Sequence, residues 1–142
     1  MTPRLLEYVK SAEKFVPHVY KDIAGFWTIG YGHRCQSDRK DVTVEEALKL
    51  LQDDLAVAEH AALHISPGLS GVRLDAITDF CFNLGAAAYA TSTLHRLVNN
   101  KEWELAAQEI QHWNHYHKEG HLLVSEGLTQ RRLVEAGWLR TG

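Results

Sequence analysis

The chain has 142 residues, of which 45% are apolar and 23% charged, and its formal net charge at pH 7 is −3. This length and balance predict one globular domain whose core needs neither disulfides nor a structural metal, and they exclude fibrous and low-complexity chains. Charges of both signs are spread along the chain without a basic stripe, so we expect no nucleic-acid partner.

No apolar run approaches the length of a membrane-spanning helix, so we expect no stable membrane insertion. The first residues, Met1 to Arg4, lead into a segment of mixed polarity that lacks the pattern of a secretory signal peptide. Cys35 and Cys81 form no C-x-x-C pair. They are predicted to be reduced thiols, while a disulfide formed between them after export stays open.

The amino-terminal part of the chain combines a helix with the one clear strand signal in the sequence. Thr2 as N-cap and Pro3 at the first helical position begin the helix, and Pro17 marks its latest end. Residues 18–33 place aromatic and β-branched residues on both sides of a turn that contains Asp22. This pattern predicts a small antiparallel hairpin or meander.

The rest of the chain is predicted to be helical. Thr43 and Glu46 form a T-x-x-E capping box at the start of a long helix that extends to about His64. Ser70 can cap the next helix, which stops at Gly85. Shorter amphipathic pieces follow, and one segment without periodicity is predicted to be a loop. The pieces lie near 92–99, 102–113 and 127–139, and the loop at 114–125.

Glu13 is an unusual charge, because it lies on the apolar arc of the first helix beside Leu6 and Val9. The carboxyl end of a helix also disfavours negative charge, so position and surroundings both favour the protonated form. A carboxylic acid that keeps its proton near neutral pH can act as a general acid. The alternative is a structural ion pair, with Lys10 as a candidate partner one turn back.

Asp22 lies nine residues after Glu13, in the predicted turn. Water and backbone donors can keep it ionised there, although Asp is also a common turn former. One buried carboxyl and one hydrated carboxylate are the pair that glycoside hydrolysis needs. Thr28, six residues further, could hold the attacking water through its hydroxyl, or it could be a structural strand residue.

These residues resemble the phage lysozyme (endolysin) family, glycoside hydrolase family 24. The motif of that family is a Glu, an Asp nine residues later, a Thr six further and a G-x-x-T-I-G-x-G-H run. The chain has Glu13, Asp22, Thr28 and the run Gly25 to His33 at this spacing. The resemblance covers essentially the whole chain and continues through later segments, which are 80–85, 92–94, 103–113 and 127–135.

The resemblance implies an α+β, mostly helical, two-lobed lysozyme-like fold in which residues 1–142 form a single catalytic domain. The small antiparallel sheet would lie in the N-terminal lobe, at about residues 14–42. A long connector helix at about 43–64 would join it to a helical lobe of about 65–142, which also takes the N-terminal helix.

The resemblance also implies a muramidase that cleaves the β-1,4 bond between N-acetylmuramic acid and N-acetylglucosamine in peptidoglycan. Glu13 would be the general acid, Asp22 would position or activate the attacking water, and Thr28 would help to hold that water. An inverting course is expected, because a water held by Asp and Thr fits the wider carboxyl separation of about 6.5–9.5 Å.

Phe82, Asn83 and Thr93 would contact the sugars, and Trp113, at the end of its helix, is the best candidate for a platform at the cleft edge. No cofactor and no metal are expected. The nine histidines contain no zinc motif, and His60 falls on the polar face of the long helix.

Two alternatives stay open on the same fold. A lytic transglycosylase would use the muramic acid 6-hydroxyl in place of water, although the presence of Asp22 favours hydrolysis. A non-catalytic module would only bind peptidoglycan. The resemblance also implies a monomer that stays in the host cytoplasm until a holin permeabilises the membrane. The protein would then reach the periplasm and cell wall.

Two further contacts are predicted from spacing. His33 could bridge to Asp54, at the edge of the apolar arc of the long helix, and so hold the lobes together. Arg131 and Arg132 lie within helical reach of Glu135 and are predicted to form an ordinary surface ion-pair cluster.

Overall fold

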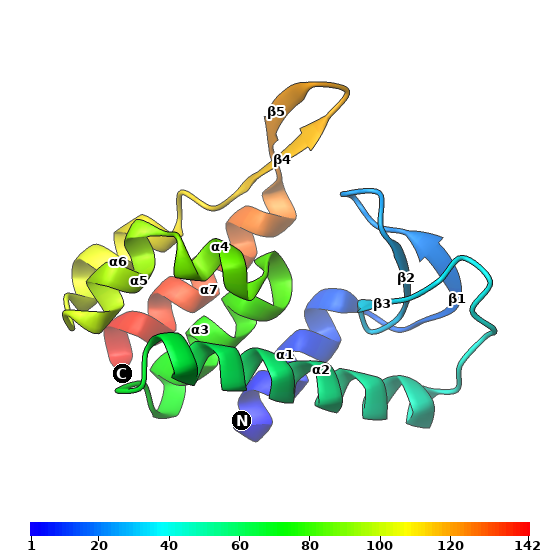
Figure 1. The fold of residues 1–142 in the computed structure, drawn as a ribbon, viewed down its shortest axis with the longest axis horizontal. Helices are drawn as coiled ribbons and strands as arrows, with labels where there is room; N and C mark the ends of the chain where they lie inside the picture. Colours follow the sequence, from blue (N-terminus) through cyan, green and yellow to red (C-terminus); the bar gives the residue numbers. More distant parts are fainter.

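The computed structural model describes all residues 1–142 as seven helices and five short strands (Figure 1). No helix is both long enough and apolar enough to cross a membrane. In chain order the elements are α1 (Pro3–Glu13), β1 (Val16–Lys21), β2 (Trp27–Gly30), β3 (His33–Arg34), α2 (Val44–Ile65), α3 (Gly71–Leu84), α4 (Ala86–Ala90), α5 (Thr93–Asn99), α6 (Trp103–Ile110), β4 (His115–Lys118), β5 (His121–Val124) and α7 (Glu126–Thr141).

The helix starts follow the capping residues in the sequence. The Thr2 hydroxyl accepts from the Leu5 amide at the start of α1, and the reciprocal capping box of Thr43 and Glu46 is complete at the start of α2. Both predicted caps are confirmed. Ser70 occupies the N-cap position of α3 as predicted, but its side chain accepts no hydrogen bond from the first turn of the helix.

The small sheet has the antiparallel order β1-β2-β3, as the sequence predicts. Tyr20 pairs with Thr28 and Lys21 with Trp27, which places Asp22 in the turn that joins the first two strands. In Figure 1 the sheet lies at one end of α2 and the α3–α7 helices at the other. This arrangement confirms the mostly helical, two-lobed α+β fold.

Two hydrophobic clusters form the cores of the two lobes, and α2 belongs to both. Its Leu55 lies in the first cluster and Ala58, less than one turn later, in the second. Phe82 and Trp138 pack against both clusters. The first consists of Leu5, Val9, Ile29, Tyr31, Val42, Ala47, Leu51 and Leu55, and the second gathers fifteen residues of α2–α7 and their connections.

The cysteines are divided between these cores. Cys35 packs against the first cluster and Cys81 is buried in the second, and both are free thiols. Burial raises the pKa of Cys81 to about 12, so this thiol stays protonated.

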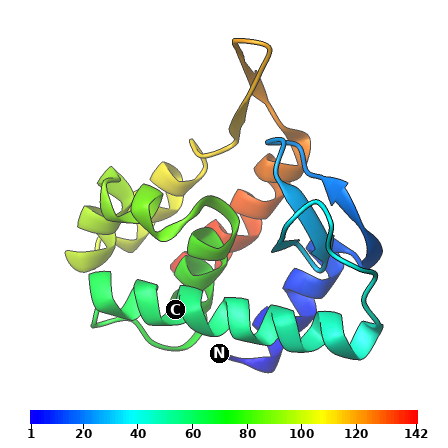
Figure 2. The same cartoon turned by 45° about the vertical axis from the view of Figure 1, so that its right-hand side comes forward.

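Residues 114–125 are not the loop that the sequence predicts. They contain a second antiparallel pair, β4 and β5, which projects from the body of the molecule (Figures 1 and 2). Glu119 and Gly120 in its turn both have positive φ, at 52° and 78°, the backbone that a tight two-residue hairpin needs. Leu122 and Val124 are about 60% exposed. Since neither face of this hairpin is covered, its strands need no alternation of apolar and polar residues, and the sequence therefore lacks the pattern that would predict them.

Candidate active site

Glu13 is the last residue of α1, and its side chain is 19% exposed. Its Oε1 accepts from Arg131 Nη1 at 2.9 Å. The other oxygen, Oε2, faces Gly32, where an added Cβ would lie only 2.9 Å away. The ion pair that the alternative interpretation predicts is therefore present, but its partner is Arg131 and not Lys10, which pairs with Glu7 at 3.4 Å. The carboxyl therefore has one oxygen fixed by Arg131 and one beside a glycine that leaves room for it.

The helix ends immediately after Glu13 because the backbone turns sharply there. Lys14 has φ 61° and ψ 153°, a region that only glycine adopts readily. Its amide still donates to the Lys10 carbonyl at 2.9 Å. A strained residue therefore fixes the direction in which the chain leaves Glu13.

Asp22 is held by the backbone of its own turn. Its Oδ1 accepts from the amides of Ala24 and Phe26, both at 2.9 Å, while Oδ2 has no partner within the protein. The half-buried Tyr20 lies near both carboxyls. Burial, then the charges of Glu13 and Asp22, raise the pKa of its phenol. The charges of Glu13 and Asp22 thus both act on the same residue of β1, and one Asp22 oxygen is open to water.

Thr28 lies on the central strand of the sheet and is only 2% exposed. Its hydroxyl donates to the Phe26 carbonyl at 2.8 Å. The hydroxyl oxygen can therefore only accept a hydrogen bond from a water, because its own proton is already used.

A cleft of ≈ 390 Å³ runs between the sheet, α2 and the end of α3. Gly32 lines it next to the Glu13 carboxyl, and Phe82 and Asn83 line it from α3. His33 and Asp54 face each other in the same cleft, with Nδ1 and Oδ2 2.8 Å apart. The predicted bridge between the sheet and α2 is confirmed.

Of the predicted site residues, only Phe82 and Asn83 line this cleft; Glu13 adjoins it through Gly32, and Asp22 and Thr28 are not part of its lining. Two of the predicted sugar contacts also lie outside it. Thr93 is exposed at the start of α5, where Ser92 is the N-cap. Trp113 packs edge-on against Phe80, with ring centroids 5.4 Å apart. Large aromatic residues on amphipathic helices commonly join a core in this way, and neither residue lines the cleft with Phe82 and Asn83.

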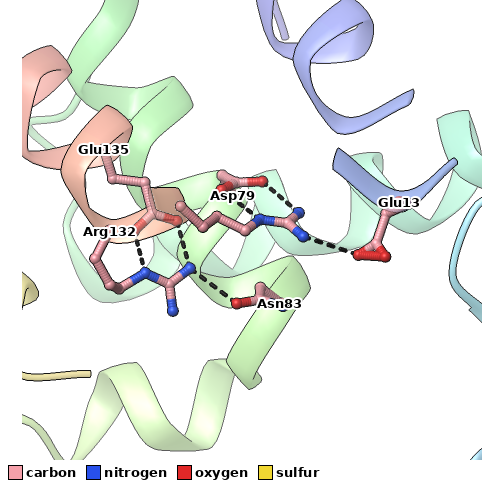
Figure 3. Close-up of polar contacts among 6 residues, drawn as sticks. Glu13, Asp79, Asn83, Arg132 and Glu135 are labelled. Atoms are coloured by element: carbon pink, nitrogen blue, oxygen red, sulfur yellow. Dashed lines mark hydrogen bonds and ion pairs between the residues drawn. The ribbon is translucent and has the colours of Figure 1, made fainter. Parts of the chain in front are cut away.

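The predicted surface cluster of α7 is wrong, because its members are buried. Arg131 is 6% exposed, and Arg132 and Glu135 are 0% exposed. Arg132 Nη2 donates to Glu135 Oε1 at 2.7 Å and to Asn83 Oδ1 at 2.9 Å (Figure 3). Arg132 Nε also lies 2.6 Å from Glu135 Oε2, as an ion pair without hydrogen-bond alignment. A helical projection shows that these residues share a face, but it cannot show what covers that face.

Asp79 of α3 was not singled out from the sequence. It is 0% exposed and accepts two hydrogen bonds from Arg131, from Nε at 3.0 Å and from Nη2 at 2.7 Å. The signal that could have found it is the pair Asp75 and Asp79, one turn apart on a helix rich in apolar residues. Buried carboxylates need buried partners, and the arginines of α7 are available for that role.

Comparison with known proteins gives a consistent result. Residues 10–135 match the family model described as phage lysozyme. The chain is 33% identical to an endolysin of Acyrthosiphon pisum secondary endosymbiont phage 1 over 132 residues, covering 92% of this chain and 90% of that protein. It is 30% identical to an endolysin of Bacillus phage PZA, over 96% of this chain but only 54% of that longer protein.

Among solved structures, the muramidase domain of SpmX from Asticaccaulis excentricus superposes with a TM-score of 0.87 at 32% identity. The match covers 99% of this chain and 97% of the other. The similarity therefore extends over both lobes and the cleft between them.

Proposed function

The chain belongs to the phage lysozyme family, and from this premise we propose the roles that its residues take in cutting the bacterial cell wall. It is a peptidoglycan hydrolase, a glycosidase of the endolysin type that lyses bacterial host cells. We propose that residues 1–142 act as one catalytic unit, with the glycan bound in the cleft between the sheet and the helical lobe.

Glu13 is the general acid in this proposal. Its Oε2 lies beside Gly32, a residue that lines the cleft, and this observation carries the assignment, because an acid must reach the departing glycosidic oxygen directly. Asp22 accepts a proton from the attacking water at Oδ2, the oxygen that its turn leaves unpartnered. Thr28 accepts a hydrogen bond from the same water. Attack by water opposite the leaving group inverts the configuration at the anomeric carbon.

Phe82 and Asn83 are the proposed sugar contacts within the cleft, Phe82 by stacking and Asn83 by hydrogen bonding. Asn83 Oδ1 is occupied by Arg132, so its amide NH₂ is the group available to the glycan. Thr93 and Trp113 would act only on a glycan long enough to extend beyond the cleft.

The test is Glu13→Gln assayed on purified peptidoglycan. Loss of a general acid should reduce the rate of turbidity clearance by at least about 10²–10⁴-fold while the variant stays folded. Glu7→Gln is the matched control, since Glu7 lies on the same helix with its side chain 71% exposed. Clearance by Glu13→Gln at the rate of the control would overturn the assignment.

Product analysis separates the alternatives on this fold. Hydrolysis leaves reducing muramic acid ends with inverted configuration, and a lytic transglycosylase leaves 1,6-anhydromuramic ends. A non-catalytic module would bind the wall without clearing it.

We further propose that the protein is a monomer that accumulates in the host cytoplasm and reaches the wall only after a holin permeabilises the membrane. Cells that express it without a holin should stay intact until chloroform is added. Lysis without permeabilisation would contradict this route.

A further inference from the structure

Glu13 is one end of a row of charged side chains drawn from α1, α3 and α7 (Figure 3). Arg131 contacts both Glu13 and Asp79. Beyond Asp79 lies the buried pair of Glu135 and Arg132. Of these five residues, only Glu13 lies next to the cleft residue Gly32.

The contact between Arg131 and Glu13 poses a chemical problem. A guanidinium within hydrogen-bond distance stabilises the ionised form of a carboxyl group, whereas a general acid must still hold its proton when the substrate binds. An arginine that faced Glu13 alone would therefore work against the proposed role of Glu13. The structure places a second carboxylate, Asp79, on the same guanidinium.

We propose that Asp79 is a positioning residue for the reaction, which neutralises Arg131 and orients it so that Glu13 can keep its proton. This inference rests on the proposed role of Glu13. Asp79 accepts from two of the five Arg131 N–H groups in a bidentate pair, at 3.0 and 2.7 Å, and one of the remaining three, on Nη1, donates to Glu13. Bidentate pairing fixes the plane of the guanidinium as well as its charge.

The geometry also divides the two oxygens of Glu13 between two tasks. Oε1 is fixed by Arg131, and Oε2 lies beside the cleft residue Gly32. In this proposal the acidic proton is held on Oε2, the oxygen nearer the cleft residue, while Oε1 continues to accept from Nη1. Asp79 thus acts on the reacting group only through Arg131.

Asp79 is suited to this task because it stays ionised. Burial opposes its charge, but the charge and hydrogen bonds of Arg131 outweigh that effect and lower its pKa. Glu135 behaves in the opposite way, since burial, against the attraction of Arg132, raises its pKa well above the ordinary value. Asp79 is therefore the carboxylate that balances the charge of Arg131.

Other charged or titratable groups near Glu13 are assigned to different partners. Tyr20 of β1 is a phenol with a raised pKa and stays neutral. Asp22 is held by its own turn, His33 by Asp54, and Lys10 of α1 by Glu7. Arg131 is the one cation that forms an ion pair with Glu13.

The test compares Asp79→Asn with Asp75→Asn in the full chain, assayed on purified peptidoglycan across pH. Asp75 is a matched control because it is also buried on α3, one turn earlier, but its partner is Thr2 rather than Arg131. In Asp79→Asn, Arg131 acts on Glu13 alone, so the alkaline limb of kcat/KM should move down by about one to two pH units. Asp75→Asn should leave the limb unmoved, whatever it does to the melting temperature.

The double variant Asp79→Asn with Arg131→Gln removes the buried pair as a unit. Its limb should lie at or above that of the unmodified protein, and it keeps the test valid if Asp79→Asn fails to fold. An unmoved limb in folded Asp79→Asn, or a lowered limb in the double variant, would overturn the role of Asp79. Neither result would affect Glu13, whose role fails separately if Glu13→Gln stays active.

Discussion

Gly32 provides a direct test of how closely the site is fitted around Glu13. It has φ +77°, and a Cβ built there would lie 2.9 Å from both Cδ and Oε2 of Glu13. Ordinary carbon contacts are about 3.5–4.0 Å, so Gly32→Ala must displace the carboxyl by about 0.5–1 Å. A displacement of that size at a reacting group can reduce the rate by about 10²-fold.

Gly120→Ala is the matched control for this substitution. Gly120, in the turn between β4 and β5, also has positive φ, at +78°, but a Cβ there meets nothing within 4 Å. Both variants place a Cβ on left-handed backbone, at about 1–2 kcal/mol, which corresponds to a fall in melting temperature of about 3–8 °C at this chain length. Because the group displaced by Gly32→Ala is the end of a flexible side chain, it adds little further destabilisation.

The two variants should therefore melt at similar temperatures and differ in activity. Thermal denaturation followed by circular dichroism measures the first quantity, and the initial rate of peptidoglycan clearance measures the second. Clearance by Gly32→Ala within about threefold of Gly120→Ala, with both proteins folded, would refute the close fit between Gly32 and the acid.

Two further substitutions test the strain after α1 and the bridge across the cleft. Lys14→Gly should raise the melting temperature by a few degrees, because it relieves about 1–3 kcal/mol of backbone strain, of which the conformational entropy of glycine offsets a part. If Lys14→Gly melts no higher than Lys14→Ala, the strain at Lys14 is refuted. Asp54→Asn should lose about 1 kcal/mol of stability with its His33 contact while most activity remains. The control is Asp53→Asn, since Asp53 is exposed and pairs with Lys49. Equal melting temperatures of Asp54→Asn and Asp53→Asn would count against the bridge.

The sequence predicts best those features that depend on local chemistry. The capping residues Thr2 and Thr43, the turn at Asp22 and the amphipathic stripe of α2 each act within a few residues of themselves, so their patterns are readable along the chain. The His33–Asp54 bridge could be proposed because a helical projection places Asp54 at the edge of an apolar stripe.

Features that depend on what covers a surface are not readable in this way. The same projection gives Arg131, Arg132 and Glu135 one polar face, and only the packing of α7 against α3 makes that face a buried one that holds Asp79. The hairpin of β4 and β5 was missed for the opposite reason, because both faces of its strands are exposed and no alternation of apolar and polar residues marks it. Glu119-Gly120 was the local signal for a tight turn there.

The position of α2 in both cores constrains how the cleft can open. Since Leu55 and Ala58 lie in different clusters but within one helical turn, the lobes share a continuous rigid axis rather than a flexible linker. A breathing motion that admits a glycan strand must then bend this helix between those two residues, or slide the shared side chains Phe82 and Trp138 against one of the cores. Opening of the groove is thus opposed both by the stiffness of this helix and by the packing of these two side chains.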